Sequence, residues 1–553
     1  MQDFFAYERL RLAYERMIIS STKDVRNHFG QSLYKIKLKE NLVDLGNRLN
    51  ANEYQPSRPF KYYEPKSIGT QRVKTVLSIE DSVVYQAITN YIAEEVYEEL
   101  DETKKFVFGN ILHENVPKGT AILDEFNPDF RFFKPYAPLF NEFVNSVNKQ
   151  VEEGNSKFKL DTDITGFFDS IPHSSLAFIL QEKGIDRQII ELLLLSLNVW
   201  SGTRNSPTFQ VGIPQGPIAS FFIANLLLHD LDKIMVREAF SYYRYTDDIK
   251  IYSDSKSELE KALVIIDLFL KDHSLSINSK KTLIEKISDN KEEEVKKALK
   301  NQSLKELILT DDEISGIESE YFEEYTSQDE NDFLMINIPS EDIKRIIKKR
   351  LSKLESEIYS TFNKHIVNNV FDFEDIGKHE DELLNYVYLW RKYLNILSDY
   401  TDNIDLNKDI ISIWIAGLNT YYWRANHFCW NLSRYKFDAP TKLLMQEINT
   451  KYKRFEWVRY QINILAIKSW NIEQTDIQEY IKKLKKEDSP LVRLSLFKIL
   501  IHHVKENSQL EVSVQELIKN DIEPYIKYTL TDWLLFTKNN TSSLNIIKSW
   551  FSL

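Results

Sequence analysis

Two adjacent aspartates interrupt an apolar segment that otherwise predicts a buried strand. The segment is YRYTDDIKIY, residues 243–252, and its acids are Asp247 and Asp248. Two like charges side by side are unfavourable in a buried strand unless a compensating charge lies beside them. A solvated surface turn would explain the pair, and so would a divalent cation bound by carboxylate oxygens. Only the second interpretation requires a further carboxylate from another segment.

A second acid at a strand end occurs earlier in the chain. Asp163 ends the segment KLDTD and is followed by a turn residue, Gly166, and two aromatic residues. Two-metal phosphoryl transfer requires carboxylates from separate segments to converge on ions about 4 Å apart. Mg²⁺ prefers such hard oxygen ligands, completed by substrate phosphates. Asp163, Asp247 and Asp248 are therefore the candidate metal ligands.

The patterns around these acids predict a mixed fold. Alternation about Gly69 predicts a hairpin over residues 59–79, and a strand running into a turn is expected over 158–171. Helical periodicity covers residues 217–236 and 257–275. Because helices and strands mix without regular βαβ alternation, we expect an α+β domain with an antiparallel sheet.

The second half of the chain has a different character. Glycine and proline become rare from residue 336 on, and apolar residues recur at helical spacing, which predicts an all-α region over 336–553. Within it, DSPLVRLSLFKILIHHV, residues 488–504, is similar to a unit of a HEAT-type helical repeat. Residues 311–332 hold ten acids and no base. We therefore expect a first domain over 1–310, an acidic linker over 311–335 and a helical domain after it.

The composition favours a folded intracellular protein. Hydrophobic residues make up 42% of the 553 residues, and a single cysteine, Cys429, excludes a disulfide framework and a Cys-rich zinc site. No run of about 18 apolar residues is present, and the N-terminus is too charged for a signal peptide. We expect a cytoplasmic protein with no membrane partner. The net charge of −12 argues against a nucleic-acid coat, although a local basic groove stays open.

Five segments, taken together, resemble the fingers and palm of a reverse transcriptase. In chain order they are PKSIGTQRVKTVLSIEDSVVYQAI (65–88), DITGFFDSI (163–171), GIPQGPIASFFIANLLLHDLD (212–232), YTDD (245–248) and LSINSKKT (275–282). The resemblance covers residues 60–285 and implies a right-hand polymerase fold with its palm core at residues 155–300.

The resemblance implies a catalytic role for four residues. Asp163, Asp247 and Asp248 would hold two Mg²⁺ ions, with Mn²⁺ as a substitute. Lys281 would protonate the leaving pyrophosphate, although the adjacent Lys280 leaves the register of this motif open.

It also implies a site for the incoming deoxynucleoside triphosphate (dNTP). Arginine suits bidentate phosphate recognition and lysine acts as a point charge. The aromatic residue of this site would crowd the ribose 2′ position, so that DNA is the product. The residues of this site would be Lys66, Arg72, Lys74, Phe168 and Gln215.

The long helical region is similar to that of bacterial abortive-infection and defence-associated reverse transcriptases, in which a helical repeat domain replaces the thumb. This resemblance implies an antiphage, homo-oligomeric enzyme whose DNA is primed on a protein hydroxyl and remains covalently attached. FVFGNILH, residues 106–113, lacks the arginine that many templated enzymes carry there, which favours template-independent synthesis. An RNA template with a noncoding RNA partner, and a degenerate polymerase scaffold, are the alternatives. The priming residue is not identified, although Tyr7 and Tyr14 are near one chain end.

Overall fold

The computed structural model describes residues 4–287 and 408–530, apart from short gaps, together with residues 380, 383, 384, 387 and 390. The gaps are 21–24, 26–30, 32–33, 68, 127, 153–155, 207–208 and 505–507. The predicted acidic linker, 311–335, lies outside the described residues, as does most of 336–407. The predicted domain boundaries therefore stay a prediction.

The chain divides into two compact units. The first comprises Met1–Tyr62, Val73–Leu299 and Asp521–Leu553, and the second comprises Tyr63–Arg72 and Lys300–Asn520. Among the described residues, no helix combines the length and apolar character needed to cross a membrane.

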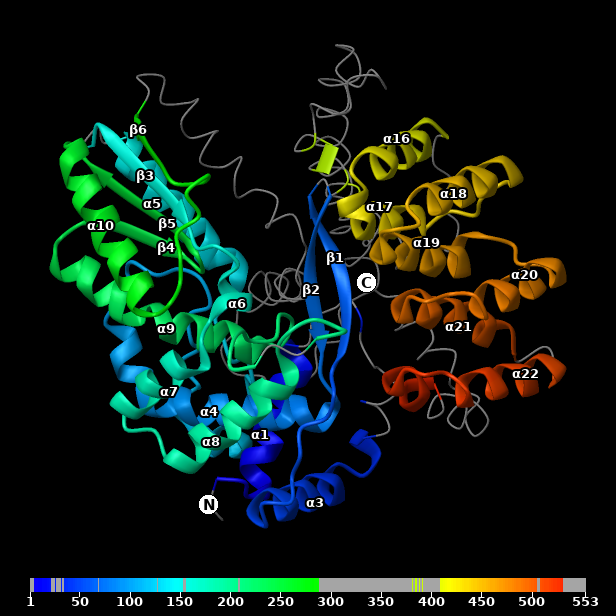
Figure 1. Cartoon of the computed structure of the whole chain (residues 1–553), viewed down its shortest axis with the longest axis horizontal. Helices are drawn as coiled ribbons and strands as arrows, with labels where there is room; N and C mark the ends of the chain where they lie inside the picture. Colours follow the sequence, from blue (N-terminus) through cyan, green and yellow to red (C-terminus); the bar gives the residue numbers. More distant parts are fainter. Residues whose placement is uncertain are drawn as a thin grey trace, which may run out of the picture. The chain divides into compact units, whose positions relative to one another are not determined.

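A four-stranded antiparallel sheet forms one part of the first unit. Its strand order is β4-β5-β3-β6, and β3 pairs with both β5 and β6 (Figure 1). The strands are β3 (Phe158–Asp163), β4 (Ser241–Tyr245), β5 (Asp248–Ser253) and β6 (Leu283–Lys286). The predicted α+β domain with an antiparallel sheet is thereby confirmed.

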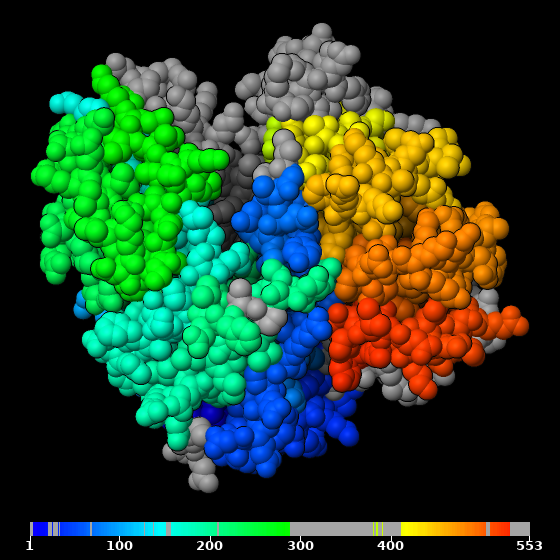
Figure 2. Space-filling view, in the orientation of Figure 1, coloured from blue at the N-terminus to red at the C-terminus, as the bar shows by residue number. Residues whose placement is uncertain are grey.

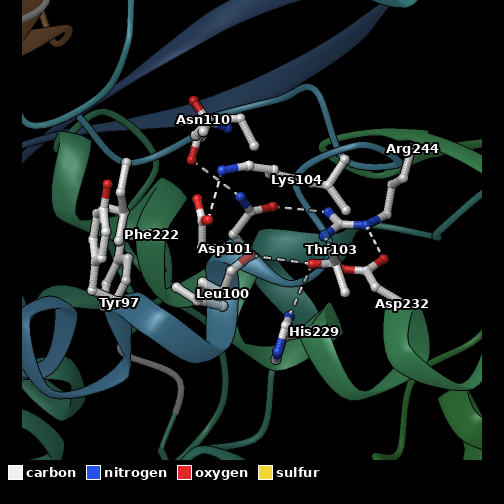
Figure 3. Close-up of a pocket in the computed structure, with 14 residues that line it drawn as sticks. Tyr97, Leu100, Asp101, Thr103, Lys104, Asn110, Phe222, His229, Asp232 and Arg244 are labelled. Atoms are coloured by element: carbon white, nitrogen blue, oxygen red, sulfur yellow. Dashed lines mark hydrogen bonds and ion pairs between the residues drawn. The ribbon is translucent and has the colours of Figure 1, made fainter. Parts of the chain in front are cut away.

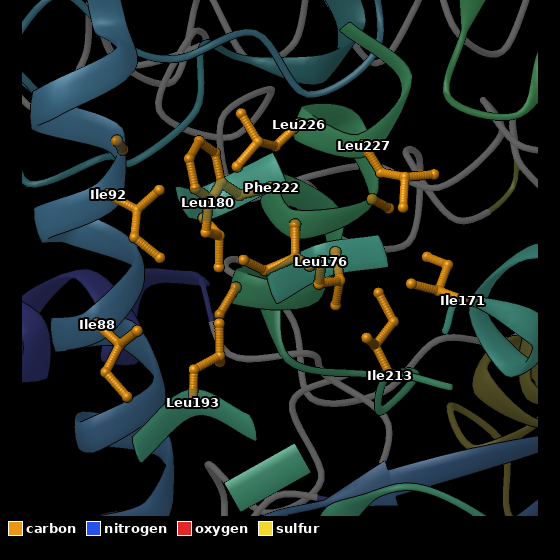
Figure 4. Close-up of a cluster of buried hydrophobic side chains, with 14 of the residues drawn as sticks. Ile88, Ile92, Ile171, Leu176, Leu180, Leu193, Ile213, Phe222, Leu226 and Leu227 are labelled. Atoms are coloured by element: carbon orange, nitrogen blue, oxygen red, sulfur yellow. The ribbon is translucent and has the colours of Figure 1, made fainter. Parts of the chain in front are cut away.

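Helices build the main hydrophobic core of the first unit. They are α1 (Tyr7–Ser20), α3 (Leu38–Asn50), α4 (Ile79–Asp101), α6 (Phe167–Ser170), α7 (His173–Glu182), α8 (Arg187–Trp200), α9 (Ile218–Arg237) and α10 (Lys256–Asp272). Helix α5 (Tyr136–Glu152) belongs to a separate, smaller cluster, in which Phe143 is buried together with Tyr245 of β4 and Tyr252 of β5. Helix α4 packs against α8 and α9, where Ile88, Leu193 and Leu226 are buried (Figure 4). Burying each such side chain contributes about 1.5–3 kcal/mol, so this cluster fixes α9 and the strands that follow it.

A hairpin connects the two units along the chain. It consists of β1 (Phe60–Ser67) and β2 (Thr70–Val76), and Gly69 in the turn has a φ of 74°. A positive φ is readily adopted by glycine, which explains why the turn forms here. The hairpin predicted over residues 59–79 is confirmed; its base lies in the first unit and its tip, Tyr63–Arg72, in the second.

Helices in pairs form the described part of the second unit. They are α16 (Lys408–Thr420), α17 (Ala425–Leu432), α18 (Ala439–Lys451), α19 (Glu456–Ser469), α20 (Gln474–Leu484), α21 (Pro490–Val504) and α22 (Ser508–Lys519), with a short 3₁₀ helix, η3 (Tyr422–Arg424), after α16. Helix α19 packs between α17 and α21, and α21 also contacts α20 and α22. Helices α18, α20 and α22 follow one another along the surface in the space-filling view (Figure 2).

The packing of these helices agrees with the sequence pattern. Helix α21 is buried from Pro490 to Ile501, as expected of a helix that is apolar on all sides and enclosed by its neighbours. Cys429 in α17 is 4% exposed and lies in the core of this unit. The all-α prediction therefore holds for the described residues beyond 408.

Candidate functional site

Strands β3 and β5 bring two of the predicted acids together. Asp163 and Asp248 are direct partners in the antiparallel register. Side chains at such positions have Cβ atoms about 4.5–5.5 Å apart and lie on one face of the sheet. Asp247 is the second residue of the two-residue turn between β4 and β5, and Asp248 is the first residue of β5. The three acids therefore gather at one end of the sheet.

Along this face of the sheet, a cross-strand pair of opposite charges is followed by a pair of like charges at Asp163. Two residues earlier, Asp161 is paired across the strands with Lys250, whose Nζ lies 2.6 Å from Asp161 Oδ1. Side chains two positions apart in a strand share a face, so the next pair along is Asp163 with Asp248. Like charges directly opposite each other are destabilising. This end of the sheet consequently favours a cation.

Lys281 supplies one such charge. Its Nζ lies 2.5 Å from Asp163 Oδ2, and the preceding turn is fixed by a hydrogen bond from Asn278 N to Asp163 O at 2.7 Å. Partial burial lowers the pKa of Lys281, but the hydrogen bond to Asp163 and the neighbouring carboxylates outweigh it, so the pKa is raised. Lys281, rather than the adjacent Lys280, is the lysine of this motif that contacts the acids.

The donor chemistry of this end of the sheet fits Mg²⁺. Asp163, Asp247 and Asp248 offer hard carboxylate oxygens from two neighbouring segments, and an ammonium group already occupies the cationic position beside Asp163. In the described part of the chain, no group of three or more His, Cys, Asp or Glu side chains is arranged as a metal site. These three residues are the ones that would hold the metal.

A buried arginine fixes the turn that bears Asp247. Arg244 is 1% exposed and donates from Nη1 to the Thr246 carbonyl oxygen at 2.7 Å. Its Nε and Nη2 bind the carboxylate of Asp232 on α9 at 2.7 and 2.6 Å. Burial lowers the pKa of Arg244, but Asp232 reverses the direction, so the arginine stays charged. The sequence reasoning missed this pair, although an arginine three residues before Asp247 in an apolar strand was a usable signal.

The turn has a strained backbone at Thr246. This residue has a φ of 56°, which is uncommon for a β-branched side chain. It is the first of the two residues that link β4 and β5, a position usually taken by glycine or asparagine. The contact with Arg244 therefore holds a conformation that the local sequence does not favour.

The segment FVFGNILH packs against the same turn. Phe108 N donates to Arg244 O, and Arg244 N donates to Phe106 O, both at 2.9 Å. Gly109 lies so close that an added Cβ would be 2.6 Å from Thr246 N. The segment that was compared with that of templated enzymes therefore supports the turn of Asp247 from its side.

A small hollow lies behind the turn, between α4 and α9 (Figure 3). Arg244, Asp232, Thr103 and His229 are among its lining residues, and His229 Nδ1 lies 3.3 Å from Thr103 Oγ1. Burial lowers the pKa of His229 despite the nearby charges of Asp232 and Glu99, which favours the neutral imidazole. The volume is about 40 Å³, enough for roughly one or two waters rather than a nucleotide.

The loop of Gln215 joins the site to the base of the hairpin. Thr75 N in β2 donates to Gln215 O at 2.8 Å. Gly216 has a φ of 144°, and a Cβ there would be 2.5 Å from Thr75 O, so this close approach requires glycine. Lys74, the neighbour of Thr75, is half-buried on β2.

Phe168 lies on the other side of that loop. Ile213 N donates to Phe168 O at 2.8 Å, and the Phe168 ring packs edge-on against Phe221 with centroids 5.3 Å apart. The half-buried ring is therefore part of the core and also borders the loop. Backbone hydrogen bonds thus connect the segments that carry Phe168, Gln215 and Lys74 within the first unit.

The two remaining predicted residues of the dNTP site lie near the hairpin tip in the second unit. Lys66 is exposed at the end of β1, and Arg72 is half-buried on β2. Asp163 belongs to the first unit.

Neither tyrosine considered as a primer has a fully exposed side chain. Tyr14 is 2% exposed and stacks on Tyr34 with centroids 6.0 Å apart. Burial, assisted by the charge of Glu15, raises the pKa of Tyr14 to about 12. Tyr7 is half-buried against the main core. Both residues fit a packing role.

A known family matches the part of the chain that holds this site. Residues 65–310 match the profile of the reverse transcriptase (RNA-dependent DNA polymerase) family, so a reverse transcriptase domain occupies this region. The match covers all the predicted site residues and less than half of the chain.

Several curated proteins are similar to parts of this chain. The retron Ec86 reverse transcriptase of Escherichia coli is 26% identical over 27% of this chain and 45% of its own length. The group II intron-encoded protein LtrA of Lactococcus lactis is 27% identical over 20% of each chain. An uncharacterised 91 kDa protein in the cob intron of Schizosaccharomyces pombe is 34% identical over 19% of this chain and 15% of its own length. The chain thus spans less than half the length of the curated relatives it matches.

Solved structures give only a weak overall likeness. The apo telomerase of Candida tropicalis covers 73% of this chain and 69% of its own at 11% identity, with a TM-score of 0.31. A score this low does not establish a shared architecture for the whole chain.

Proposed function

We propose that the chain is a Mg²⁺-dependent DNA polymerase, in which the reverse transcriptase domain of residues 65–310 joins deoxynucleotides at Asp163, Asp247 and Asp248. The observation that carries this proposal is the cross-strand pair of Asp163 and Asp248, with Lys281 on the Asp163 carboxylate. A purely structural turn would not need two opposed carboxylates at the end of adjacent strands.

Each residue of the proposed site has its own role in the reaction. Asp163, Asp247 and Asp248 would hold two Mg²⁺ ions, or Mn²⁺ in their place, and the chemistry supplied by the ions would be activation of the primer hydroxyl and charge neutralisation at the leaving pyrophosphate. Lys281, with its raised pKa, holds a proton at neutral pH and donates it to the leaving group. Gln215 and Phe168 border the sugar of the incoming dNTP, and Phe168 excludes a 2′-hydroxyl. Lys66, Arg72 and Lys74 bind the triphosphate.

The cellular role that we propose is antiphage defence of the abortive-infection type, in the bacterial cytoplasm. The helical unit replaces a thumb, and its paired helices act as HEAT-like repeats. Two contacts support that comparison: Ser489 Oγ accepts the Val492 N–H at the start of α21, and Arg493 Nη1 donates to Asp488 O at 2.9 Å. The proposed enzyme is a homo-oligomer whose DNA product is primed on a protein hydroxyl without a template.

Templated synthesis is the second candidate. The domain is similar to a retron reverse transcriptase and to a group II intron-encoded protein, and this similarity favours an RNA template with a noncoding RNA partner. A degenerate polymerase that acts as a binding scaffold is the third candidate. The intact set of acids disfavours it.

One experiment separates these functions. Purified protein is incubated with Mg²⁺ and labelled dNTPs without nucleic acid, and the products are resolved by denaturing electrophoresis with and without protease. Label that stays on the protein until protease treatment supports protein priming. Product that forms only with added RNA contradicts it and favours the templated enzyme, and no product under either condition favours the scaffold.

Two variants show whether the acids perform the chemistry. Asp247→Ala is expected to abolish DNA synthesis, because the removed carboxylate is a metal ligand. Asp254→Ala is the matched control, since Asp254 is an exposed aspartate just beyond the opposite end of β5. Equal activity of the two variants would contradict the assignment of the site.

A further inference from the structure

The tip of the β1–β2 hairpin is held by side chains of the helical unit. The hairpin tip and these side chains belong to the same, second compact unit. Glu456 Oε1 accepts a hydrogen bond from Tyr63 N at 2.7 Å, and the hydroxyl oxygen of Tyr422 accepts one from Gly69 N at 2.8 Å. One contact lies at the start of the tip and the other in its turn, so the two together fix its position and its orientation.

The carboxylate of Glu456 is built into this contact. Glu456 is the first residue of α19 and only 7% exposed. Its second oxygen, Oε2, accepts a hydrogen bond from the Ser489 hydroxyl. A carboxylate near a helix N-terminus is stabilised by the helix dipole, and both of its oxygens are used here. A buried charge that accepts a backbone N–H from a distant strand is a specific recognition contact.

The same network extends through the helical unit. Ser489 N donates to Glu487 Oε1 at 3.0 Å, and Arg459 on α19 forms an ion pair with Glu487. Ser489 and Glu487 lie in the turn before α21. The contact at Tyr63 is therefore continuous with the packing of α19 against α21.

Tyr422 is held by an aromatic cluster. Its ring lies 4.7 Å from that of Tyr452 and 4.5 Å from that of Phe455, between centroids. Tyr422 is 9% exposed, so its hydroxyl has a fixed direction toward the turn of the hairpin. Tyr452 uses its own hydroxyl on Asn419 O and makes no described contact with the hairpin.

The base of the hairpin is fixed separately, within the first unit. Lys61 is buried and donates to Trp200 O at 2.6 Å and to Gly202 O at 2.7 Å, at the end of α8. Thr75 N binds the loop of Gln215, as described above. Residues 66 and 72 belong to the tip, and the contacts that hold the tip within its own unit include those of Glu456 and Tyr422.

We propose that Glu456 and Tyr422 are positioning residues, through which the helical unit sets the hairpin tip and thereby the affinity for the incoming dNTP. This inference rests on the proposed function, because Lys66 and Arg72 are assigned there to the triphosphate. The helical unit then acts directly on substrate binding, and a ligand or partner that shifts α19 would change the apparent affinity for dNTPs.

Substitutions that remove single hydrogen-bond partners test the proposal. Tyr422→Phe removes the hydroxyl and keeps the ring, and we expect the KM for dNTP to rise roughly three- to tenfold with a smaller change in kcat, the size of effect of one hydrogen bond. Glu456→Ala is expected to raise KM at least as much, and Glu456→Gln, which keeps an acceptor for Tyr63 N, to restore it. Tyr452→Phe is the matched control and should leave KM unchanged.

A double-variant cycle shows whether the effect acts through the hairpin. In a Lys66→Ala background, Tyr422→Phe should add little to the rise in KM, because the positioned side chain is already absent. Independent, multiplicative effects would contradict the proposal, as would a fall in kcat without a change in KM.

Hydrogen exchange gives a readout that does not depend on activity. Amides of the hairpin, residues 60–76, should exchange faster in Tyr422→Phe than in wild-type protein or in Tyr452→Phe. If wild-type protein makes no DNA while exchange changes as expected, the polymerase assignment fails and the contact stands. If wild-type protein is active while exchange and KM are unchanged in Tyr422→Phe, the positioning role is overturned and the polymerase assignment stands.

Discussion

Arg244 donates a hydrogen bond of 2.7 Å to the carbonyl oxygen of Thr246, the residue immediately before Asp247. The same guanidinium is paired with the buried carboxylate of Asp232 on α9. The position of the acidic turn is therefore set by the helical core of the first unit, and not by the strands alone.

Removing Arg244 should destabilise the first unit strongly. Arg244→Ala leaves Asp232 buried without its partner, and the loss in unfolding free energy is expected to be about 3–5 kcal/mol. Arg187→Ala is the control, since Arg187 makes an exposed i,i+4 pair with Glu191 that contributes at most about 0.5 kcal/mol. Denaturant titration measures both. Similar losses for the two variants would show that the buried pair has no special role.

Gly109 should be required for activity more than for stability. An alanine Cβ at this position would clash with Thr246 N at 2.6 Å, so Gly109→Ala should displace the turn of Asp247 and lower DNA synthesis about tenfold or more. Gly184→Ala is the comparison: Gly184 has a φ of 71° with open space around it, so this change strains the backbone away from the site. It should cost about 1 kcal/mol in stability with activity retained. Measuring synthesis and unfolding for both variants checks the distinction.

The two adjacent lysines of the LSINSKKT segment should behave differently. Lys281 contacts Asp163, so Lys281→Met should reduce DNA synthesis by about 100-fold or more if its proton is used in the reaction. Lys280→Met should have a small effect. Single-turnover rates of the two variants decide between them, and a larger loss with Lys280→Met would shift the motif by one residue.

Phe168 should determine the sugar that is accepted. Phe168→Ala is expected to increase the use of ribonucleotides relative to deoxynucleotides, because space opens beside the loop of Gln215. Phe178→Ala removes an exposed phenylalanine on α7 and should leave the ratio unchanged. Incorporation assays with paired dNTP and rNTP substrates measure the ratio. An unchanged ratio in Phe168→Ala would restrict this ring to packing.

A buried lysine should make the stability of the helical unit depend on pH. Burial lowers the pKa of Lys498 to about 7, whereas a lysine in an unfolded chain has a pKa of about 10.4. Between these values the unfolded chain holds a proton that the folded chain has released, so stability rises with pH by up to about 1.4 kcal/mol per unit. The stability difference between Lys498→Met and wild-type protein should therefore change between pH 6 and pH 9, in favour of the wild type at high pH. Lys519→Met, at an exposed position on α22, should show a constant difference in the same denaturation series.

The sequence predicted the elements that have strong local signals. Period-two alternation around Gly69 identified the hairpin, and the apolar runs of residues 217–236 and 257–275 identified α9 and α10. The three acids were recognisable because charged residues at the ends of apolar strands need a reason. The structure pairs two of these acids, Asp163 and Asp248, across adjacent strands. Their joint role as metal ligands with Asp247 stays a prediction.

Other features depend on contacts between distant segments and have no local signal. The pairing of Arg244 with Asp232 needs the packing of β4 on α9, and the approach of Gly109 to Thr246 needs a segment more than 130 residues earlier in the chain. The hydrogen bond that holds Tyr63 of the hairpin tip comes from Glu456, nearly 400 residues later in the chain. Spacing along the chain carries no information about such neighbours.

The left-handed backbone at Thr246 has an energetic consequence. A conformation of this kind costs on the order of 1 kcal/mol or more for a β-branched residue, and glycine would adopt it without that cost. Retaining threonine here means that the protein is less stable than its own fold would allow. The hydrogen bond from Arg244 to Thr246 O offsets part of that cost, so the geometry of the acidic turn is maintained at the expense of stability.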